Sequence, residues 1–166
     1  MLGKTVLLAT RALLVLAKEP PGTIISPRSI ASVLNESPAY MAKVVRLLVR
    51  AGILRAEKGV KGGVFLSRQT ADVTLLEVVE ACQGTFHGSY CQPIDDPKTT
   101  CAFHRAAVEL ERAMVGVLSA WTLARMEKLP GPVAHKPGEM HCLMAGFPAA
   151  ITSGPRARRR RRGASA

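Results

Sequence analysis

The alternation of apolar and polar positions predicts two short helices between residues 26 and 50, joined by a tight polar turn at residues 35–37. Each helix opens with Ser-Pro, at Ser26 and Ser37, where serine caps free backbone N–H groups and proline fills the first helical position. The residues that share one side are Ile30, Ala31 and Leu34 in the first helix and Met41, Val44, Val45 and Leu48 in the second. Two amphipathic helices joined in this way form a helix-turn-helix, whose second helix commonly enters the major groove of DNA.

The outer side of the second helix distinguishes a DNA-reading helix from an ordinary helical hairpin packed for stability alone. Its members are Ser37, Ala39, Tyr40, Lys43, Arg46 and Arg50. Hydrogen-bonding groups thus stand near the N-terminus and cations further along. A recognition helix reads bases with its first turns and holds phosphates with its cations, so we expect Tyr40 and Lys43 near base edges and the two arginines on phosphates.

A β-hairpin is predicted immediately after this helix. Two short β-prone runs, 53–57 and 64–68, flank the glycine-rich turn at 58–63. A hairpin in this position is a wing, and its tip carries Lys58 and Lys61. We expect these lysines to grip phosphate or to reach into the minor groove, with the glycines allowing a close approach of backbone to the duplex.

Two further helices complete the predicted winged domain. The N-terminal one turns a set of apolar residues to the core: Val6, Ala9, Ala12, Leu13 and Leu16. The other begins at Thr74, which forms a capping box with Glu77, while Val73 and Val78 are spaced as a hydrophobic staple.

Residues 101–127 contain no proline and are predicted to form one long helix. Its apolar positions recur with gaps of four and three, at Phe103, Ala107, Leu110, Met114, Val117, Trp121 and Ala124. That repeat is typical of the seam between paired helices, although a helix lying on its own core would also be apolar along one stripe. Ala106 and Leu118 widen the stripe enough to serve both surfaces, which favours a homodimer through residues 101–127.

The net charge of +11 is unevenly distributed. Residues 1–129 carry sixteen Lys and Arg against eleven Asp and Glu, and residues 130–166 carry seven against one. Because residues 1–129 are basic even without residues 130–166, their net charge favours a polyanionic partner. Residues 130–166, rich in proline, glycine and arginine, are interpreted as a disordered basic tail. No apolar run is long enough to span a bilayer, so we expect no membrane contact and a cytoplasmic location.

The ordered set of these motifs resembles the bacterial winged helix-turn-helix transcription regulators of the IscR/NsrR type (Rrf family), from about Lys4 to Met126. The segments that carry the resemblance are ATRALLVLA, Ser-Pro-Ala-Tyr, LVRAGIL, the KGVKGG wing and TLLEVVEA. The resemblance implies a homodimeric regulator of a palindromic operator. An enzyme that uses Cys91 and His104 as nucleophile and base is disfavoured, because no third group, substrate-pocket motif or phosphate loop is evident. Many members of the family carry an iron–sulfur cluster, whereas others sense through thiols or small ligands.

The same resemblance assigns candidate cluster ligands. Cys91 matches the first ligand position, Cys101 the last cysteine and His104 the histidine that trails it, but the family's middle cysteine is absent. These three would hold a [2Fe–2S] cluster in preference to a [4Fe–4S] one. The fourth ligand stays open between Asp95 or Asp96, His87, Cys142 and a residue of the partner chain. The alternatives to the cluster are a reversible Cys91–Cys101 disulfide and the remnant of a lost site, and Cys82 is expected to be a buried core thiol.

The sequence therefore predicts a mainly α-helical chain with a small β-hairpin. Residues 1–82 form the winged helix-turn-helix domain, 83–129 a sensor loop with a long dimerisation helix, and 130–166 the tail. The expected function is that of a DNA-binding transcription regulator, acting as a repressor and sensing redox state, iron or nitric oxide. The alternative is an RNA- or ribosome-associated basic winged helix, which would need neither a palindrome nor a dimer.

Overall fold

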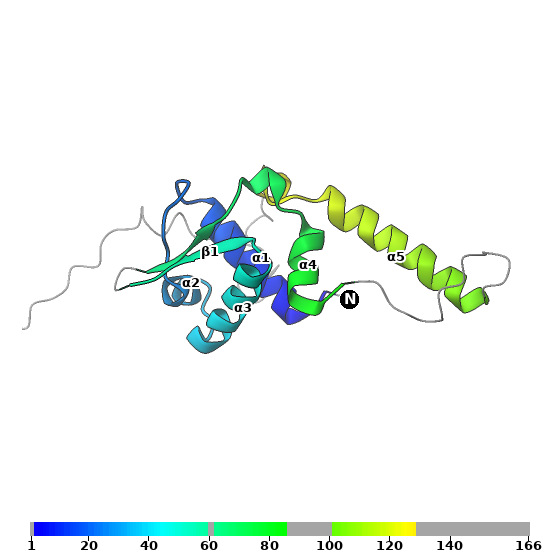
Figure 1. Cartoon of the computed structure of the whole chain (residues 1–166), viewed down its shortest axis with the longest axis horizontal. Helices are drawn as coiled ribbons and strands as arrows, with labels where there is room; N and C mark the ends of the chain where they lie inside the picture. The colour runs from blue at the N-terminus through cyan, green and yellow to red at the C-terminus, as the bar shows by residue number, and fades with distance from the viewer. Residues whose placement is uncertain (1, 60–61, 86–100, 129–166) are drawn as a thin grey trace, which may run out of the picture.

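The computed structural model describes residues 2–59, 62–85 and 101–128. The helices and strands in chain order are α1 (Lys4–Ala17), α2 (Pro27–Val33), α3 (Pro38–Arg50), β1 (Leu54–Glu57), β2 (Gly63–Leu66), the 3₁₀ turn η1 (Thr70–Asp72), α4 (Leu75–Gln83), α5 (Ala102–Ala120) and α6 (Leu123–Lys128). Figure 1 shows α1 to α4 and the hairpin gathered in one body, from which α5 extends as an arm. This is the predicted mainly helical winged helix-turn-helix.

Helix α1 is the centre of the core. All five of its residues that were predicted to face inward are buried, and Leu8, Leu14 and Val15 are buried as well. A helix that is apolar on nearly all sides needs partners all round. Helix α1 accordingly contacts α3, α4, α6 and β2.

The wing is a two-stranded antiparallel hairpin in which Leu54 lies opposite Leu66. Its base is tied to the segment that precedes α2, because Ile25 and Val64 exchange two backbone hydrogen bonds of 3.0 and 2.8 Å. A Cβ on Gly63 would lie 2.5 Å from the Ile25 carbonyl oxygen. This glycine is thus required by the packing of the chain on itself, a reason different from the duplex approach that the sequence suggested.

Helix α4 begins as predicted. The Thr74 side chain accepts a hydrogen bond from the Glu77 amide, and the Glu77 carboxylate accepts one from the Thr74 amide at 2.9 Å. The same carboxylate pairs with Arg68 at 2.6 Å, which joins the segment after the wing to α4. Burial alone would raise the pKa of Glu77, but the hydrogen bonds from Thr74 and Arg68 outweigh it and lower that pKa. Val73 and Val78, the predicted staple, are both fully buried.

The predicted continuous helix over 101–127 is wrong at its C-terminal end. Helix α5 stops at Ala120, Trp121 is extended, and α6 begins at Leu123. Here the backbone groups form hydrogen bonds with a distant segment of the chain instead of within a helix. The Trp121 carbonyl accepts a hydrogen bond from the Leu75 amide at 2.7 Å, and the Leu123 amide donates one to the Val73 carbonyl at 3.0 Å. These bonds fasten the end of α5 to the start of α4.

The C-terminal end of α5 and the stretch that follows it belong to the core of the winged domain. Leu123 is fully buried in the main apolar cluster, and Leu118 is buried against Val6 and Val79. Leu118 and Leu123, which the sequence analysis assigned to the segment 83–129, thus complete the core of the winged domain. Within the described ranges, no helix is both long and apolar enough to cross a membrane.

Candidate nucleic-acid interface

The helix-turn-helix is closed by local hydrogen bonds. The Ser26 side chain accepts from the Ser29 amide at 3.0 Å, so the first predicted cap is confirmed. The second is wrong in its hydrogen bond, since Ser37 occupies the capping position of α3 but its side chain makes no capping hydrogen bond. Between the helices, Asn35 has a φ of 51°, and the Glu36 amide donates to the Ala31 carbonyl at 2.9 Å. A left-handed residue lets the chain reverse in so few positions.

Helix α3 has two chemically distinct sides. Its four predicted core residues are all buried, with Met41, Val44 and Leu48 completely so. The opposite side is open to solvent along its length, at Ser37, Ala39, Lys43, Arg46 and Arg50. The helix is therefore held from behind, with a polar and cationic surface in front.

Tyr40 lies between these two sides. It is half-buried, and its hydroxyl is 2.9 Å from the Thr5 hydroxyl on α1. The Lys4 ammonium lies 5.8 Å from the centre of the Tyr40 ring. The tyrosine thus anchors the N-terminal turn of α3 to α1.

Arg11 is a cation that does not belong to the outer surface. It points from α1 to the turn of the helix-turn-helix, where its guanidinium lies 3.9 Å from the Glu36 carboxylate. Both side chains are about four-fifths covered, at 20% and 21% exposed. This pair joins α1 to the turn that orients α3.

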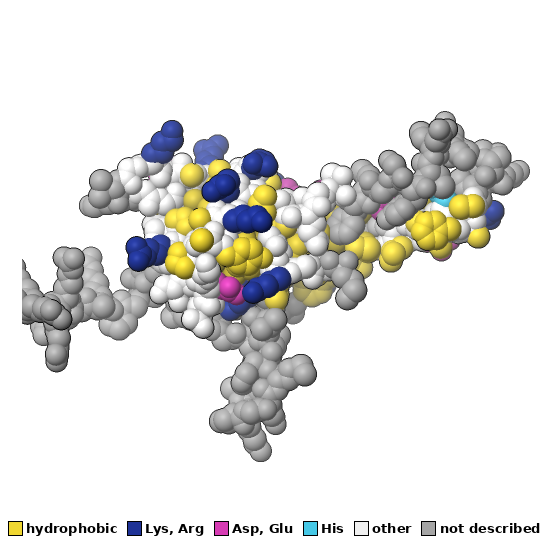
Figure 2. Space-filling model, turned by 90° about the horizontal axis from the view of Figure 1, so that it is seen from below, with side chains coloured by type: hydrophobic (Ala, Val, Ile, Leu, Met, Phe, Trp, Pro, Cys, Tyr) yellow, Lys and Arg dark blue, Asp and Glu magenta, His cyan; other side chains and the backbone are white. Residues whose placement is uncertain are grey.

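The wing lies beside α3 and adds to the same surface. Lys58 is exposed at the end of β1, whereas Lys61 lies outside the described residues. The structure also exposes Arg28 on α2 and Arg55 on β1, which sequence reasoning missed. The sequence signal for Arg28 was a charged residue directly after the Ser-Pro start of α2, and the signal for Arg55 was an alternating position in the first strand. Figure 2 shows Lys and Arg side chains gathered over this face with little acidic surface among them.

The candidate metal ligands are only partly described. Cys101 is exposed at the capping position of α5, and its sulfur accepts a hydrogen bond from the His104 amide at 3.4 Å. The His104 Nδ1 atom is buried, and none of the described residues offers it a hydrogen-bond partner. Cys91, Asp95, Asp96, His87 and Cys142 lie outside the described residues. In the part of the chain that is described, no three His, Cys, Asp or Glu side chains converge on a metal position.

Cys82 is a separate thiol on α4. It is half-buried and packs against both apolar clusters, and this burial raises its pKa. A thiol with a raised pKa carries little of the reactive thiolate. The residue is thus a core thiol, more open than the full burial that its sequence position suggested.

Similarity to known proteins agrees with this geometry. Residues 2–128 match the model of the Rrf2 family, described as iron-dependent transcriptional regulators. The chain is 29% identical over 139 residues to YwgB of Bacillus subtilis, covering 81% of this chain and 85% of that protein. It is 30% identical over 122 residues to YffB of Lactococcus lactis, covering 69% and 78%. The names of both describe them as HTH-type transcriptional regulators.

Two solved structures show the same fold. CymR of B. subtilis, titled the global cysteine regulator, superposes with a TM-score of 0.61 at 21% identity, covering 76% of this chain and 95% of that one. IscR of T. potens gives 0.59 at 22% identity, covering 77% and 86%.

A helix-turn-helix with an adjoining wing and a cationic outer surface defines the class of winged helix-turn-helix DNA-binding proteins. The family match then makes the assignment particular: this chain belongs to the Rrf2 family and is a DNA-binding transcriptional regulator. The family is one of regulators and not of enzymes.

Proposed function

We propose that the protein acts in the cytoplasm as a homodimeric repressor that binds a palindromic operator. The observation that carries this proposal is the exposed polar and cationic side of α3 beside the wing, on a helix whose other side is fully packed. Tyr40 and Lys43, with Ser37 and Ala39, are the proposed contacts to base edges and their surroundings. Arg46, Arg50, Lys58 and Lys61 are the proposed contacts to phosphate or to the minor groove.

Dimerisation is supported by the arm that α5 forms. Three large apolar side chains seven residues apart are exposed on it: Phe103 at 68%, Leu110 at 61% and Val117 at 59%. Among the described residues, the side chain of α5 that is buried is Leu118, near the C-terminal end of the helix, where it packs against Val6 and Val79. An apolar stripe of this length in water favours a partner helix, and Figure 2 shows apolar side chains along the arm.

A two-fold pair of such chains would place two copies of α3 about 34–36 Å apart or a multiple of it, which matches successive major grooves. The direct test is a gel-shift selection against genomic fragments, followed by sedimentation of the free protein. We expect a dimer that selects sites with inverted half-sites. A monomer that binds nucleic acid without any sequence preference would contradict the proposal and would favour the RNA-associated alternative.

Individual residues are tested on the selected operator. Lys43→Ala should cost about 1–3 kcal/mol and relax the choice of base at one position, because a base contact discriminates between sequences. Lys61→Ala should weaken all sequences alike, as loss of a phosphate contact does. If both variants weaken operator and random DNA by the same factor, Lys43 is not a base contact.

Regulation is proposed to act through Cys91, Cys101 and His104. Cys101 and His104 stand together at the start of α5, the helix proposed to join the subunits. Either an iron–sulfur cluster or a Cys91–Cys101 disulfide would link the chemistry of this region to the position of that helix, and so to the spacing of the two copies of α3 in the dimer. Purification without oxygen, followed by iron and sulfide assays, separates the two. Iron-free protein that forms a disulfide would leave the thiol switch.

A further inference from the structure

The first turn of α3 is the end of the proposed recognition helix that carries no charge of its own. Residues 37–40 read Ser-Pro-Ala-Tyr, whereas the cations of the helix begin at Lys43 and continue toward the wing. A helix of about 10–12 Å diameter nearly fills a major groove about 12 Å wide, so phosphates line both of its sides. A cation for the phosphates beside this first turn therefore has to come from another element.

Lys4, on the first turn of α1, lies beside the uncharged end of α3. Its ammonium is 5.8 Å from the centre of the Tyr40 ring, and the hydroxyl of the next residue, Thr5, is 2.9 Å from the Tyr40 hydroxyl. Figure 1 shows the N-terminal end of α1 on the lower side of the body, where α3 also begins, and Figure 2 views the molecule from that side. Helix α1 thereby brings a cation to the end of α3 that lacks one.

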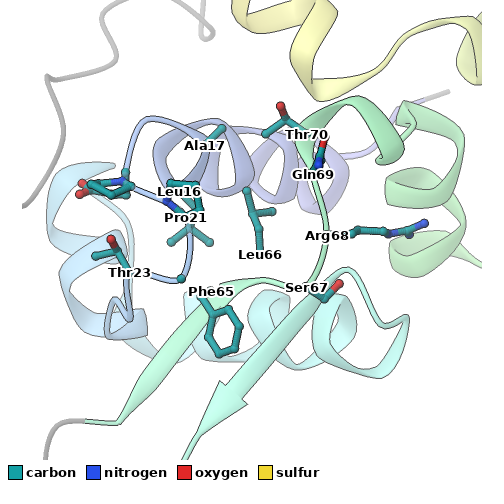
Figure 3. A pocket seen from close by; sticks show the side chains of 13 residues that line it. Leu16, Ala17, Pro21, Thr23, Phe65, Leu66, Ser67, Arg68, Gln69 and Thr70 are labelled. Carbon is teal, nitrogen blue, oxygen red and sulfur yellow. The ribbon is translucent and has the colours of Figure 1, made fainter.

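The charge of Lys4 is available, whereas other cations of the body are engaged. Arg11 pairs with Glu36. Arg68 lines the hollow between the end of α1 and the segment after β2, where Figure 3 shows its side chain directed to α4, and it is bound to Glu77 at 2.6 Å. Lys4, in contrast, is exposed, the first turn of α1 contains no acidic residue, and no ion pair joins Lys4 to another described residue.

The contact with the Tyr40 ring orients the Lys4 ammonium without neutralising it. Attraction of a cation to an aromatic ring extends to about 6 Å from the ring centre and is weak at exposed sites, so at 5.8 Å this contact is near its limit. A phosphate carries a full negative charge and forms charge-assisted hydrogen bonds with an ammonium group. The lysine can therefore exchange the ring for a phosphate with a small movement of its side chain.

We propose that Lys4 binds a backbone phosphate of the operator at the edge of the groove that faces the first turn of α3. The N-terminal end of α1 is then a third element of the DNA interface, at the opposite end of α3 from the wing. A phosphate contact carries no sequence information, so Lys4 contributes affinity for all sequences alike. This inference rests on the proposed function, in which α3 enters the major groove.

The contribution to affinity is tested with the full chain by salt titration of operator binding. Each phosphate contact contributes about 0.9 to the slope of log K against log salt, so Lys4→Ala should lower that slope by about 1.8 in the proposed dimer. Lys4→Arg keeps the charge and should keep the slope of the parent. Lys128→Ala, which removes an exposed lysine from α6, the helix packed against η1, is the matched control and should also keep it. An unchanged slope in Lys4→Ala would overturn the proposal.

The place of the contact is tested with operators in which one phosphate at a time is replaced by an uncharged methylphosphonate. Replacement of the phosphate beside the first turn of α3 should weaken binding of the parent and of Arg46→Ala, and should leave binding of Lys4→Ala unchanged. If Lys4→Ala and the parent respond alike at every phosphate, the proposal is wrong. A changed base preference in Lys4→Ala with the phosphate response of the parent would make Lys4 a positioning residue for Tyr40, and would also overturn the phosphate contact.

These measurements separate the inference from the proposed function. A parent protein that selects no operator overturns both. A parent that selects an operator, with Lys4→Ala equal to Lys128→Ala in salt slope and in phosphate response, overturns the inference alone. Because Lys4 is exposed and alanine is a good helix former, we expect Lys4→Ala to fold, which circular dichroism checks.

Discussion

Loss of one proposed phosphate contact should change the salt dependence of operator binding by a calculable amount. Arg46 is exposed in the middle of the outer side of α3 and belongs to neither apolar cluster. Arg46→Ala therefore removes a charge and leaves the packing of the helix in place. The effect is expected in DNA binding and not in folding.

The magnitude follows from counterion release. Each phosphate contact contributes about 0.9 to the slope of log K against log salt, so a dimer that loses Arg46 from both subunits should lose about 1.8 from that slope. When the salt concentration rises fourfold, the affinity of the parent for the operator should fall about 12 times more than the affinity of the variant. At low salt the variant should bind clearly more weakly.

The assay is fluorescence anisotropy of a labelled operator, titrated at several salt concentrations. The matched control is Arg112→Ala, which removes an exposed arginine from α5, away from α3 and the wing. The control should leave the slope unchanged. An unchanged slope in Arg46→Ala, or an equal fall in both variants, would refute the placement of Arg46 on phosphate.

Three further predictions concern stability. Leu123→Ala should lower the free energy of unfolding by about 2–5 kcal/mol in urea titration, because a fully buried leucine leaves a cavity; a cost below about 1 kcal/mol would contradict its place in the core. Gly63→Ala should destabilise the fold and broaden the wing amides in NMR spectra, since the new methyl would press on the Ile25 carbonyl; an unperturbed spectrum would show that the contact relaxes freely. The pKa of Glu77 is lowered below its ordinary 4.5, so its carboxylate stabilises the fold above that pH, and the contribution disappears as the pH falls through the folded-state pKa. Glu77→Gln should therefore flatten the dependence of the free energy of unfolding on pH in that range, and Arg68→Gln should flatten it in part.

Local patterns in the sequence were sufficient for the elements that depend on neighbours along the chain. The spacing of Met41, Val44 and Leu48 placed α3 and its buried side correctly, and Thr74 with Glu77 marked the start of α4. Periodicity reports which residues avoid water, and a capping box closes within one turn, so neither needs the rest of the fold. The same periodicity also identified the outer side of α3, because the polar and cationic residues lie opposite the apolar ones.

What the sequence by itself determined is thus a helix-turn-helix with a wing, a basic outer side and a heptad stripe. The tertiary structure alone decided where α5 ends, since Trp121 and Leu123 form hydrogen bonds with residues 46 and 50 positions earlier, and no proline or glycine lies at the break. It alone joined Tyr40 to Thr5 and revealed the role of Gly63. The physical reason is that hydrogen bonds and steric contacts between distant segments depend on their relative positions, which packing of the whole core establishes.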